Sequence, residues 1–260
     1  MNIEKKYMAK ERIALSLIAL IMVLSLVAVL QIEPIAQDLA YHNFADAREM
    51  FQISNFWNVV SNLGFLLVGF YALYKLFVVK SLLIVNEIKI AYTLFFLAIV
   101  LVSFGSSYYH LDPNNETLLW DRLPMTIAFM ALFSSIIAEF ISVKIGRVVL
   151  FPLLVFGMGS VLYWFFGELE GMGDLRAYVL VQFLPIVIMP MIFTLFSSSF
   201  SLVKGYWLLL LCYLVAKVFE YFDAQIYEIL GVISGHSLKH MISALGVFIL
   251  VRSFERRYGL

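Results

Sequence analysis

Hydrophobic residues along this chain gather into eight long runs, separated by short links that are polar or contain glycine. The runs cover residues 13–31, 56–79, 88–110, 117–139, 147–166, 175–198, 205–222 and 234–252. A helix that crosses the hydrocarbon core of a bilayer needs about 20 mostly apolar residues. Each of the eight runs is close to that length, so the pattern predicts an all-α integral membrane protein with eight transmembrane helices.

The composition agrees with this prediction. Hydrophobic residues make up 63% of the chain and charged residues 14%, whereas soluble domains have about 45–50% and about 25%. The net charge is zero, so no basic surface suggests a nucleic-acid partner. The one cysteine, Cys212, lies in an apolar run and is expected to be a small buried side chain.

The first apolar run follows a basic segment with Lys5, Lys6, Lys10 and Arg12. A signal peptide begins in this way. However, the apolar stretch is long for a signal peptide, and no clear small-x-small cleavage site follows it. We therefore expect an uncleaved N-terminal anchor.

Lysine and arginine in the links predict the orientation, because cytoplasmic loops carry an excess of both. With the N-terminus in the cytoplasm, the inner side receives Lys5, Lys6, Lys10, Arg12, Lys75, Lys80, Lys89, Lys144, Arg147, Lys204, Arg252, Arg256 and Arg257. The outer side receives Arg48, Arg122 and Arg176. Both termini are therefore expected in the cytoplasm.

The four histidines, His42, His110, His236 and His240, all fall at or near the outer side of this topology. Ionisable residues inside a membrane are costly, usually face the bundle interior and often carry function. His236 and His240 are four residues apart, which places both imidazoles on one helix face, as two ligands of one metal ion require. The HxxxH pair alone is a weak motif, and its place in a membrane span strengthens the metal interpretation.

A second polar group joins the third and fourth runs. Ser106 and His110 are also four residues apart, and Asp121 follows beyond a short turn. The turn makes the two helices antiparallel neighbours, so His110 and Asp121 are expected at similar depth. Asp121 is either a catalytic carboxylate or a cap of the helix N-terminus.

A third polar group lies at the outer end of the second run. Asn58, Ser61 and Asn62 share one helix face, where they either form hydrogen bonds between helices or orient the ligands or the substrate. In the seventh run, Lys217 and Glu220 are three residues apart and are expected to form a structural ion pair.

These groups together suggest a hydrolytic zinc centre. Three histidines with an open fourth position are typical of catalytic zinc, and His110, His236 and His240 would be the ligands. Asp121 would act as general base and acid, and Ser106 would orient the water or stabilise an oxyanion. A site walled by lipid implies a lipid substrate that enters from the bilayer.

Four ordered blocks of the chain resemble the alkaline ceramidase family of the CREST superfamily of membrane hydrolases. The blocks are Asn55-Phe56-Trp57-Asn58-Val59-Val60-Ser61-Asn62, Gly105-Ser106-Ser107-Tyr108-Tyr109-His110, Asp121-Arg122-Leu123-Pro124-Met125 and Gly235-His236-Ser237-Leu238-Lys239-His240. The resemblance implies zinc on the three histidines, with Ser106 and Asp121 beside it. It also implies hydrolysis of the ceramide amide to a sphingoid base and a fatty acid.

The resemblance also divides the chain. It implies a seven-helix catalytic core over residues 56–253, with an additional N-terminal helix within 1–32, an outer loop over 33–55 and a cytoplasmic tail over 254–260. Family members in eukaryotes carry an acidic calcium-binding segment before the core. Here Asp46 is the one acidic residue between Tyr41 and Arg48, and Asn55 stands where the family has glutamate, so no calcium is predicted.

Two other functions compete with a ceramidase. One is a related CREST hydrolase with another lipid substrate, as in the progestin/adipoQ receptor branch. The other is a receptor or transporter whose polar layer binds a ligand or an ion. The polar layer lies near one face and no inverted repeat is visible, which argues against transport. No sequence feature indicates an obligate protein partner.

Overall fold

The computed structural model describes residues 3–260, with side chains from residue 10 onward, and α-helices dominate this part of the chain. The helices are α1 (Ile3–Gln31), α2 (Phe56–Val60), α3 (Leu63–Tyr74), α4 (Lys89–Leu111), α5 (Asn115–Phe140), α6 (Val143–Leu169), α7 (Arg176–Leu195), α8 (Lys204–Tyr221), α9 (Asp223–Leu230) and α10 (Gly235–Arg256). Side chains of Lys5 and Lys6, which entered the orientation prediction, lie outside the described residues.

The chain is an all-α membrane protein with several spans, as predicted. Within the described residues, seven stretches are long and apolar enough to cross a membrane, and α8 with α9 makes an eighth if that bent pair is one span. The second stretch runs over Phe56–Val79 and joins α2, α3 and a short π-helical turn at Lys75–Val79. Helix α1 begins at Ile3, ten residues before the predicted run at 13–31, and the other spans begin within a few residues of their predicted starts.

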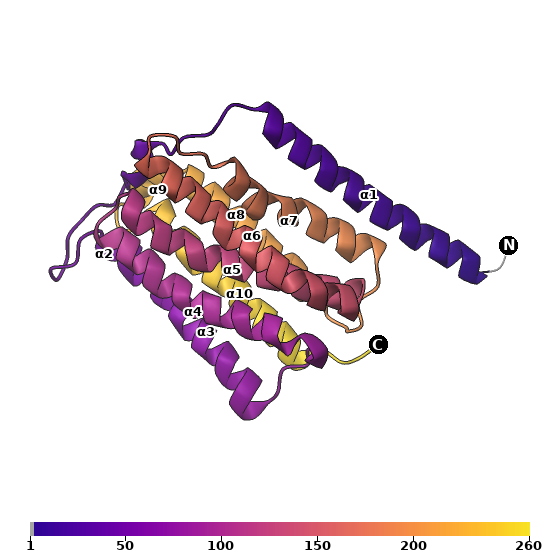
Figure 1. Ribbon diagram of the computed structural model, residues 1–260. Coiled ribbons are helices and arrows are strands. Elements are labelled where there is room, and N and C mark those ends of the chain that lie inside the picture. The colour runs from indigo at the N-terminus through magenta and orange to yellow at the C-terminus, as the bar shows by residue number, and fades with distance from the viewer. Residues whose placement is uncertain (1–2) are drawn as a thin grey trace.

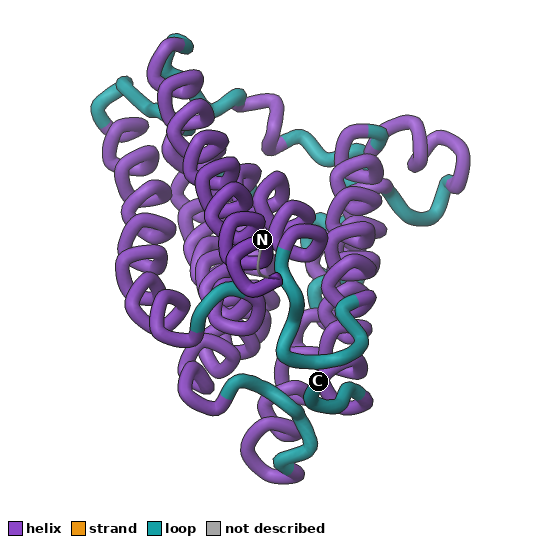
Figure 2. The backbone as a smooth tube through the Cα atoms, turned by 90° about the vertical axis from the view of Figure 1, so that its right-hand side faces the viewer, coloured by secondary structure: helices purple, strands orange, loops and turns teal. Residues whose placement is uncertain are grey.

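The long helices form one bundle (Figures 1 and 2). Helix α4 packs along α3 and α5, helix α5 also packs along α6, and α8 packs along α10. Helix α1 lies on the outside against α7 (Figure 1). Most of its apolar side chains are exposed, as in Val23 and Leu24, which suits a helix surrounded by lipid.

The seventh predicted run ends at a sharp bend. Helices α8 and α9 meet at Phe222 at an angle of 79°, and α9 lies at the same end of the bundle as α2 (Figure 1). The C-terminal residues lie at the opposite end (Figure 1). The end of α4, the start of α5 and the start of α10 all lie at the same end of the bundle as α9.

The chain end is more firmly attached than the predicted boundary at residue 254 suggests. Helix α10 continues to Arg256, and the next residue, Arg257, is buried. Its Nη1 lies 2.9 Å from Oε2 of Glu139 on α5. The same carboxylate oxygen accepts a hydrogen bond of 2.9 Å from the Tyr206 hydroxyl. A buried ion pair therefore attaches the C-terminal segment to α5.

Candidate metal centre

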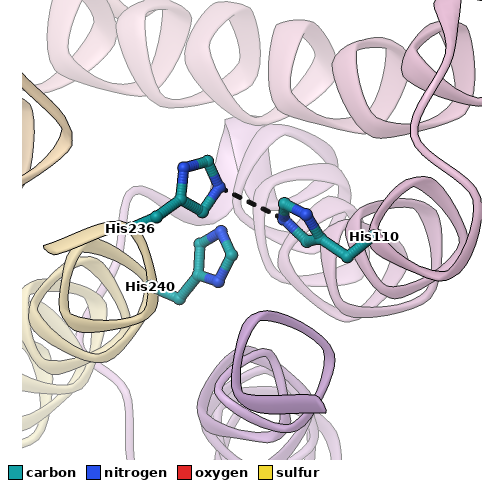
Figure 3. A group of neighbouring side chains, drawn as sticks. All are labelled: His110, His236 and His240. Atoms are coloured by element: carbon teal, nitrogen blue, oxygen red, sulfur yellow. Dashed lines mark hydrogen bonds between the residues drawn. The ribbon is translucent and has the colours of Figure 1, made fainter. Parts of the chain in front are cut away.

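Three histidines meet at the end of the bundle where α4 ends and α10 begins. His110 comes from the last turn of α4, and His236 and His240 come from the first two turns of α10. All three side chains are buried, and one ring nitrogen of each lies within 4.8 Å of the others. The imidazoles point toward one another from facing helices (Figure 3). This group could hold a metal ion.

The spacing of the nitrogens suits tetrahedral coordination. Nε2 of His110 and Nε2 of His236 are 3.3 Å apart. Two imidazole nitrogens that bind zinc at about 2.0–2.1 Å in a tetrahedron lie about 3.3 Å apart. Histidine binds a metal ion through an uncharged imidazole, which offers one nitrogen lone pair as the ligand. The donor set and its spacing therefore fit Zn²⁺.

Ser61 determines which nitrogen of His240 faces the other histidines. Its Oγ lies 2.9 Å from Nδ1 of His240 and donates its own hydrogen to the carbonyl of Asn58 at 3.1 Å. The serine oxygen therefore accepts from Nδ1–H, which leaves Nε2 of His240 with a free lone pair. Hydrogen bonds of this kind fix the tautomer and orientation of metal-binding histidines. Nδ1 of His110 is buried and has no hydrogen-bond partner among the described residues.

Hydrogen bonds link the polar segment of Asn58 and Asn62 to neighbouring helices, which is one of its two expected roles. Oδ1 of Asn58 accepts a 2.7 Å hydrogen bond from the hydroxyl of Ser237 on α10. The carbonyl of Asn62 accepts a 2.9 Å bond from Ser103 on α4. These bonds join α2 and α3 to the two helices that carry the histidines. At Asn62 the bond is made by the backbone, and the side chain donates to the carbonyl of Asn58 at 2.8 Å.

Ser106 and Asp121 lie side by side on the neighbouring helices α4 and α5. Both are buried, and both line the cavity described below. Gly105 permits this approach, because a Cβ at that position would lie 2.1 Å from the carbonyl oxygen of Trp120. The carboxylate and the hydroxyl predicted for catalysis are therefore close together.

The alternative that Asp121 caps the helix is wrong. Helix α5 begins at Asn115, and its N-cap is Asn114, whose side chain accepts from Glu116 and Thr117 N–H. Asp121 lies in the second turn, where backbone N–H groups already bond within the helix. Its side chain lines the cavity and does not cap the N-terminus of α5.

The start of α10 is fixed by two contacts that the sequence did not reveal. Oδ1 of Asp223 accepts a 2.6 Å hydrogen bond from the backbone N–H of His236. A Cβ on Gly235 would lie 2.2 Å from the carbonyl oxygen of Phe219. Glycine before His236 thus permits the same close packing as glycine before Ser106. A polar residue directly after a bend is the only local signal for Asp223.

The loop before α2 covers the three histidines. The ring of Phe44 lies 4.7 Å from His110 and 4.6 Å from His236, between centroids. Nδ1 of His42 lies 2.9 Å from the Tyr109 hydroxyl, and its Nε2 lies 3.0 Å from Oδ1 of Asn115. Both nitrogens of His42 are thus engaged away from the three histidines.

A cavity of about 580 Å³ reaches the three histidines at His240. Ser106, Asp121 and His240 line it, together with residues of α7, α8 and the loop at 35–41. A second, apolar cavity of about 160 Å³ lies deeper in the bundle. Phe65, Met125 and Phe129 line both, so the polar cavity continues toward the apolar interior.

Charged side chains also line this cavity. Nζ of Lys217 lies 2.6 Å from Oε2 of Glu220, which confirms the predicted ion pair. Nζ of Lys239 lies 2.6 Å from the other oxygen of Glu220. The second lysine was not foreseen, because only the packing of α8 on α10 brings it to the glutamate. Cys212 is buried among apolar residues, as expected.

Comparison with known proteins finds no family model that matches the chain and no similar curated protein. The possible chemistry of the site therefore has to be inferred from its own residues and their geometry.

Proposed function

We propose that this protein is a zinc-dependent hydrolase of the membrane, which cleaves the N-acyl amide of ceramide-like lipids to a fatty acid and a free amine, the sphingoid base. One observation carries the proposal: three buried histidines, whose ligand nitrogens all lie within 4.8 Å of one another, are close to a buried carboxylate and hydroxyl at the wall of a cavity. The ordered sequence blocks that resemble alkaline ceramidases contain all five of these residues. A related CREST-type hydrolase with another lipid substrate is the neighbouring alternative.

His110, His236 and His240 would hold the ion. A zinc ion bound there would supply a Lewis acid for the substrate carbonyl and lower the pKa of a bound water to about 7. Asp121 would take a proton from the attacking water and pass it to the leaving nitrogen as the carbon–nitrogen bond breaks. Ser106, next to this carboxylate, would donate a hydrogen bond to the oxygen that gains charge.

The cavity supports a lipid substrate. His240 and Asp121 line it, and it shares lining residues with an adjacent apolar cavity. Ile99, Leu132 and Met189 line that second cavity. An amide placed at Asp121 can therefore direct a hydrocarbon chain into the bundle. Burial of each CH₂ group contributes about 0.8 kcal/mol, so this arrangement favours long-chain substrates.

The distribution of lysine and arginine supports a cytoplasmic location of both termini. The site lies at the opposite end of the bundle from the C-terminus (Figure 1). On this orientation the chemistry takes place near the outer leaflet, and the lipid reaches the site from that side of the bilayer.

The test is to purify the protein in detergent, measure zinc per chain, and assay fatty-acid release from a fluorescent ceramide. We expect about one zinc per chain in the wild type and in His42→Ala, the matched control, because both ring nitrogens of His42 are engaged elsewhere. His240→Ala should lose zinc and turnover. Asp121→Asn should retain zinc and lose at least about 100-fold in turnover.

Two other outcomes would lead to different conclusions. Zinc without ceramide turnover would retain the metal centre and direct the search to other N-acyl lipids. Wild-type protein without zinc affinity would overturn the metal centre and favour a receptor or transporter with a polar ligand site.

A further inference from the structure

Arg122 is a buried cation without a carboxylate partner. Its side chain lines the polar cavity, and only 5% of the residue is exposed. Among the described side chains, no carboxylate lies within salt-bridge distance of it, and Nη1 has no hydrogen-bond partner. A guanidinium cannot lose its proton at ordinary pH. Its charge therefore stays in the cavity wall and requires compensation.

The contacts of Arg122 position the guanidinium without neutralising it. Its Cζ lies 4.4 Å from the ring centre of Trp164 and 4.9 Å from that of Tyr178. Nη2 donates a 2.7 Å hydrogen bond to Oε1 of Gln37. Aromatic faces and an amide oxygen attract a cation but carry no net charge. Asp121 is adjacent in sequence and also lines the cavity, but among the described side chains it forms no salt bridge with Arg122.

Arg176 shows how this fold treats an arginine that has a partner. Its Nη2 lies 2.9 Å from Oδ2 of Asp174. Burial raises the pKa of the Asp174 carboxyl, but the hydrogen bonds from Arg176 outweigh burial and hold that pKa below its ordinary value. Arg122 is more deeply buried and yet lacks such a carboxylate.

The other charges of the cavity do not supply the missing anion. Glu220 is shared by Lys217 and Lys239, so this group retains one positive charge. Asp38 lies at the exposed rim, where its carboxylate accepts from the backbone N–H of Ala40. Three carboxylates and three cations line the cavity, and among the described residues Arg122 is the one of these cations with no carboxylate within salt-bridge distance. An unpaired guanidinium beside an apolar interior suits an amphiphile with an anionic group.

We propose that the cavity selects an N-acyl lipid whose head group carries a phosphate or carboxylate, bound by the guanidinium of Arg122 with its apolar chain toward Phe65 and Phe129. The amide in this ligand rests on the proposed function, whereas the anion rests on Arg122 alone. The planar guanidinium suits both anions, because it offers parallel donors to two oxygens. Neutral ceramide would then be the poorer ligand.

The experiment compares ligands that differ only in charge. Ceramide and ceramide 1-phosphate of the same chain length are offered together to detergent-solubilised full-length Asp121→Asn, and native mass spectrometry measures the ratio of bound lipids. N-oleoylglycine and N-oleoylglycinamide form a second pair, which distinguishes a carboxylate from a phosphate. Binding is read without turnover, so a failure of the hydrolase proposal does not affect the result.

We expect the anionic member of at least one pair to bind about 10- to 100-fold more tightly, as a charged hydrogen bond predicts. The deciding comparison adds Arg122→Gln in the same background, which should abolish the preference. Arg122→Lys should retain part of it, and the control Arg176→Gln should retain all of it. Binding of ceramide itself reports whether each variant is folded.

Two results would overturn the proposal. One is equal binding of charged and neutral lipids in both pairs, since removal of the Asp121 charge already favours anions. The other is a preference that survives in Arg122→Gln. If Arg122→Gln does not fold, Arg122→Lys decides, because a preference unchanged in that variant would show that the guanidinium does not bind the anion.

Discussion

Ser61 shows how one hydroxyl can prepare a histidine for a metal. Because it accepts from Nδ1 of His240 and donates to the carbonyl of Asn58, it holds the imidazole in the tautomer with a free Nε2. Asn58 is itself fixed by the hydroxyl of Ser237. The small polar residues around the histidines thus form one connected network, and the orientation of each depends on the next.

Replacement of Ser61 by alanine should therefore weaken metal binding without unfolding the protein. We expect zinc affinity to fall about 10- to 100-fold, the usual effect of losing a partner that orients a metal-binding histidine. Competition with a chromogenic chelator measures this affinity. The matched control is Ser135→Ala, because Ser135 is also buried and donates only to the carbonyl of Leu132 in its own helix. Equal affinity in the two variants would contradict the role of Ser61.

Arg122 shows the opposite situation at the same scale. Its environment of Trp164, Tyr178 and Gln37 fixes the position of the side chain and leaves its charge available. Fixed position with uncompensated charge is what a binding group needs, since little ordering has to occur when the ligand arrives.

Helix packing places the catalytic candidates through two glycines. Gly105 lets α4 approach α5 next to Ser106, and Gly235 lets α10 approach the end of α8 next to His236. At each position a side chain would meet a backbone carbonyl, which cannot swing aside. The distance between helices, and with it the distance between polar side chains, is therefore set by the residue before each site residue.

The variant Gly105→Ala should separate α4 from α5. Because its Cβ would lie 2.1 Å from the carbonyl oxygen of Trp120, we expect a loss of about 1–3 kcal/mol in the free energy of unfolding and a loss of turnover. Thermal unfolding in detergent and fatty-acid release are the measurements. Gly159→Ala is the control, since a Cβ there would have no described heavy atom within 4 Å, and alanine favours a helix. A Gly105→Ala protein as stable and active as this control would contradict the argument.

At the scale of the whole molecule, the two ends of the bundle differ: one holds the candidate site and the other a buried ion pair. The end with the histidines holds the cavity and the charged wall. The opposite end is closed by Arg257, whose buried pair with Glu139 ties the last residues to α5. Helix α5 also carries Asp121 and Arg122, so this ion pair stabilises the helix that bears the proposed catalytic carboxylate and the proposed anion-binding group.

Loss of this buried pair should affect stability more than the site. Glu139→Gln leaves the Arg257 charge buried without its partner, which costs about 3–5 kcal/mol. We expect a lower midpoint of thermal unfolding and an unchanged zinc content at low temperature, because the pair lies at the far end from the histidines. Glu87→Gln, at an exposed glutamate, should change neither. A Glu139→Gln protein that unfolds at the wild-type temperature would show that the pair adds no stability.

Much of the architecture could be read from the chain because membrane helices obey local rules. A run of about 20 apolar residues forms a helix regardless of its neighbours, since its backbone groups must bond within the segment. Helix periodicity alone also predicts that residues four apart, such as His236 and His240, lie on one face of their helix. The short turn after His110 also made α4 and α5 neighbours by connection alone.

Tertiary structure decided what lies between helices that are distant in sequence. Only packing brought His110 to the HxxxH pair, gave Glu220 its second lysine and joined Ser61 to His240. Packing also buried Arg122 with no carboxylate within salt-bridge distance among the described residues. Local periodicity fixes the face of one helix, but the depth, rotation and distance between two helices depend on side chains from both. The sequence by itself therefore determined the helices and their polar faces, and the three-dimensional fold decided which of those faces meet.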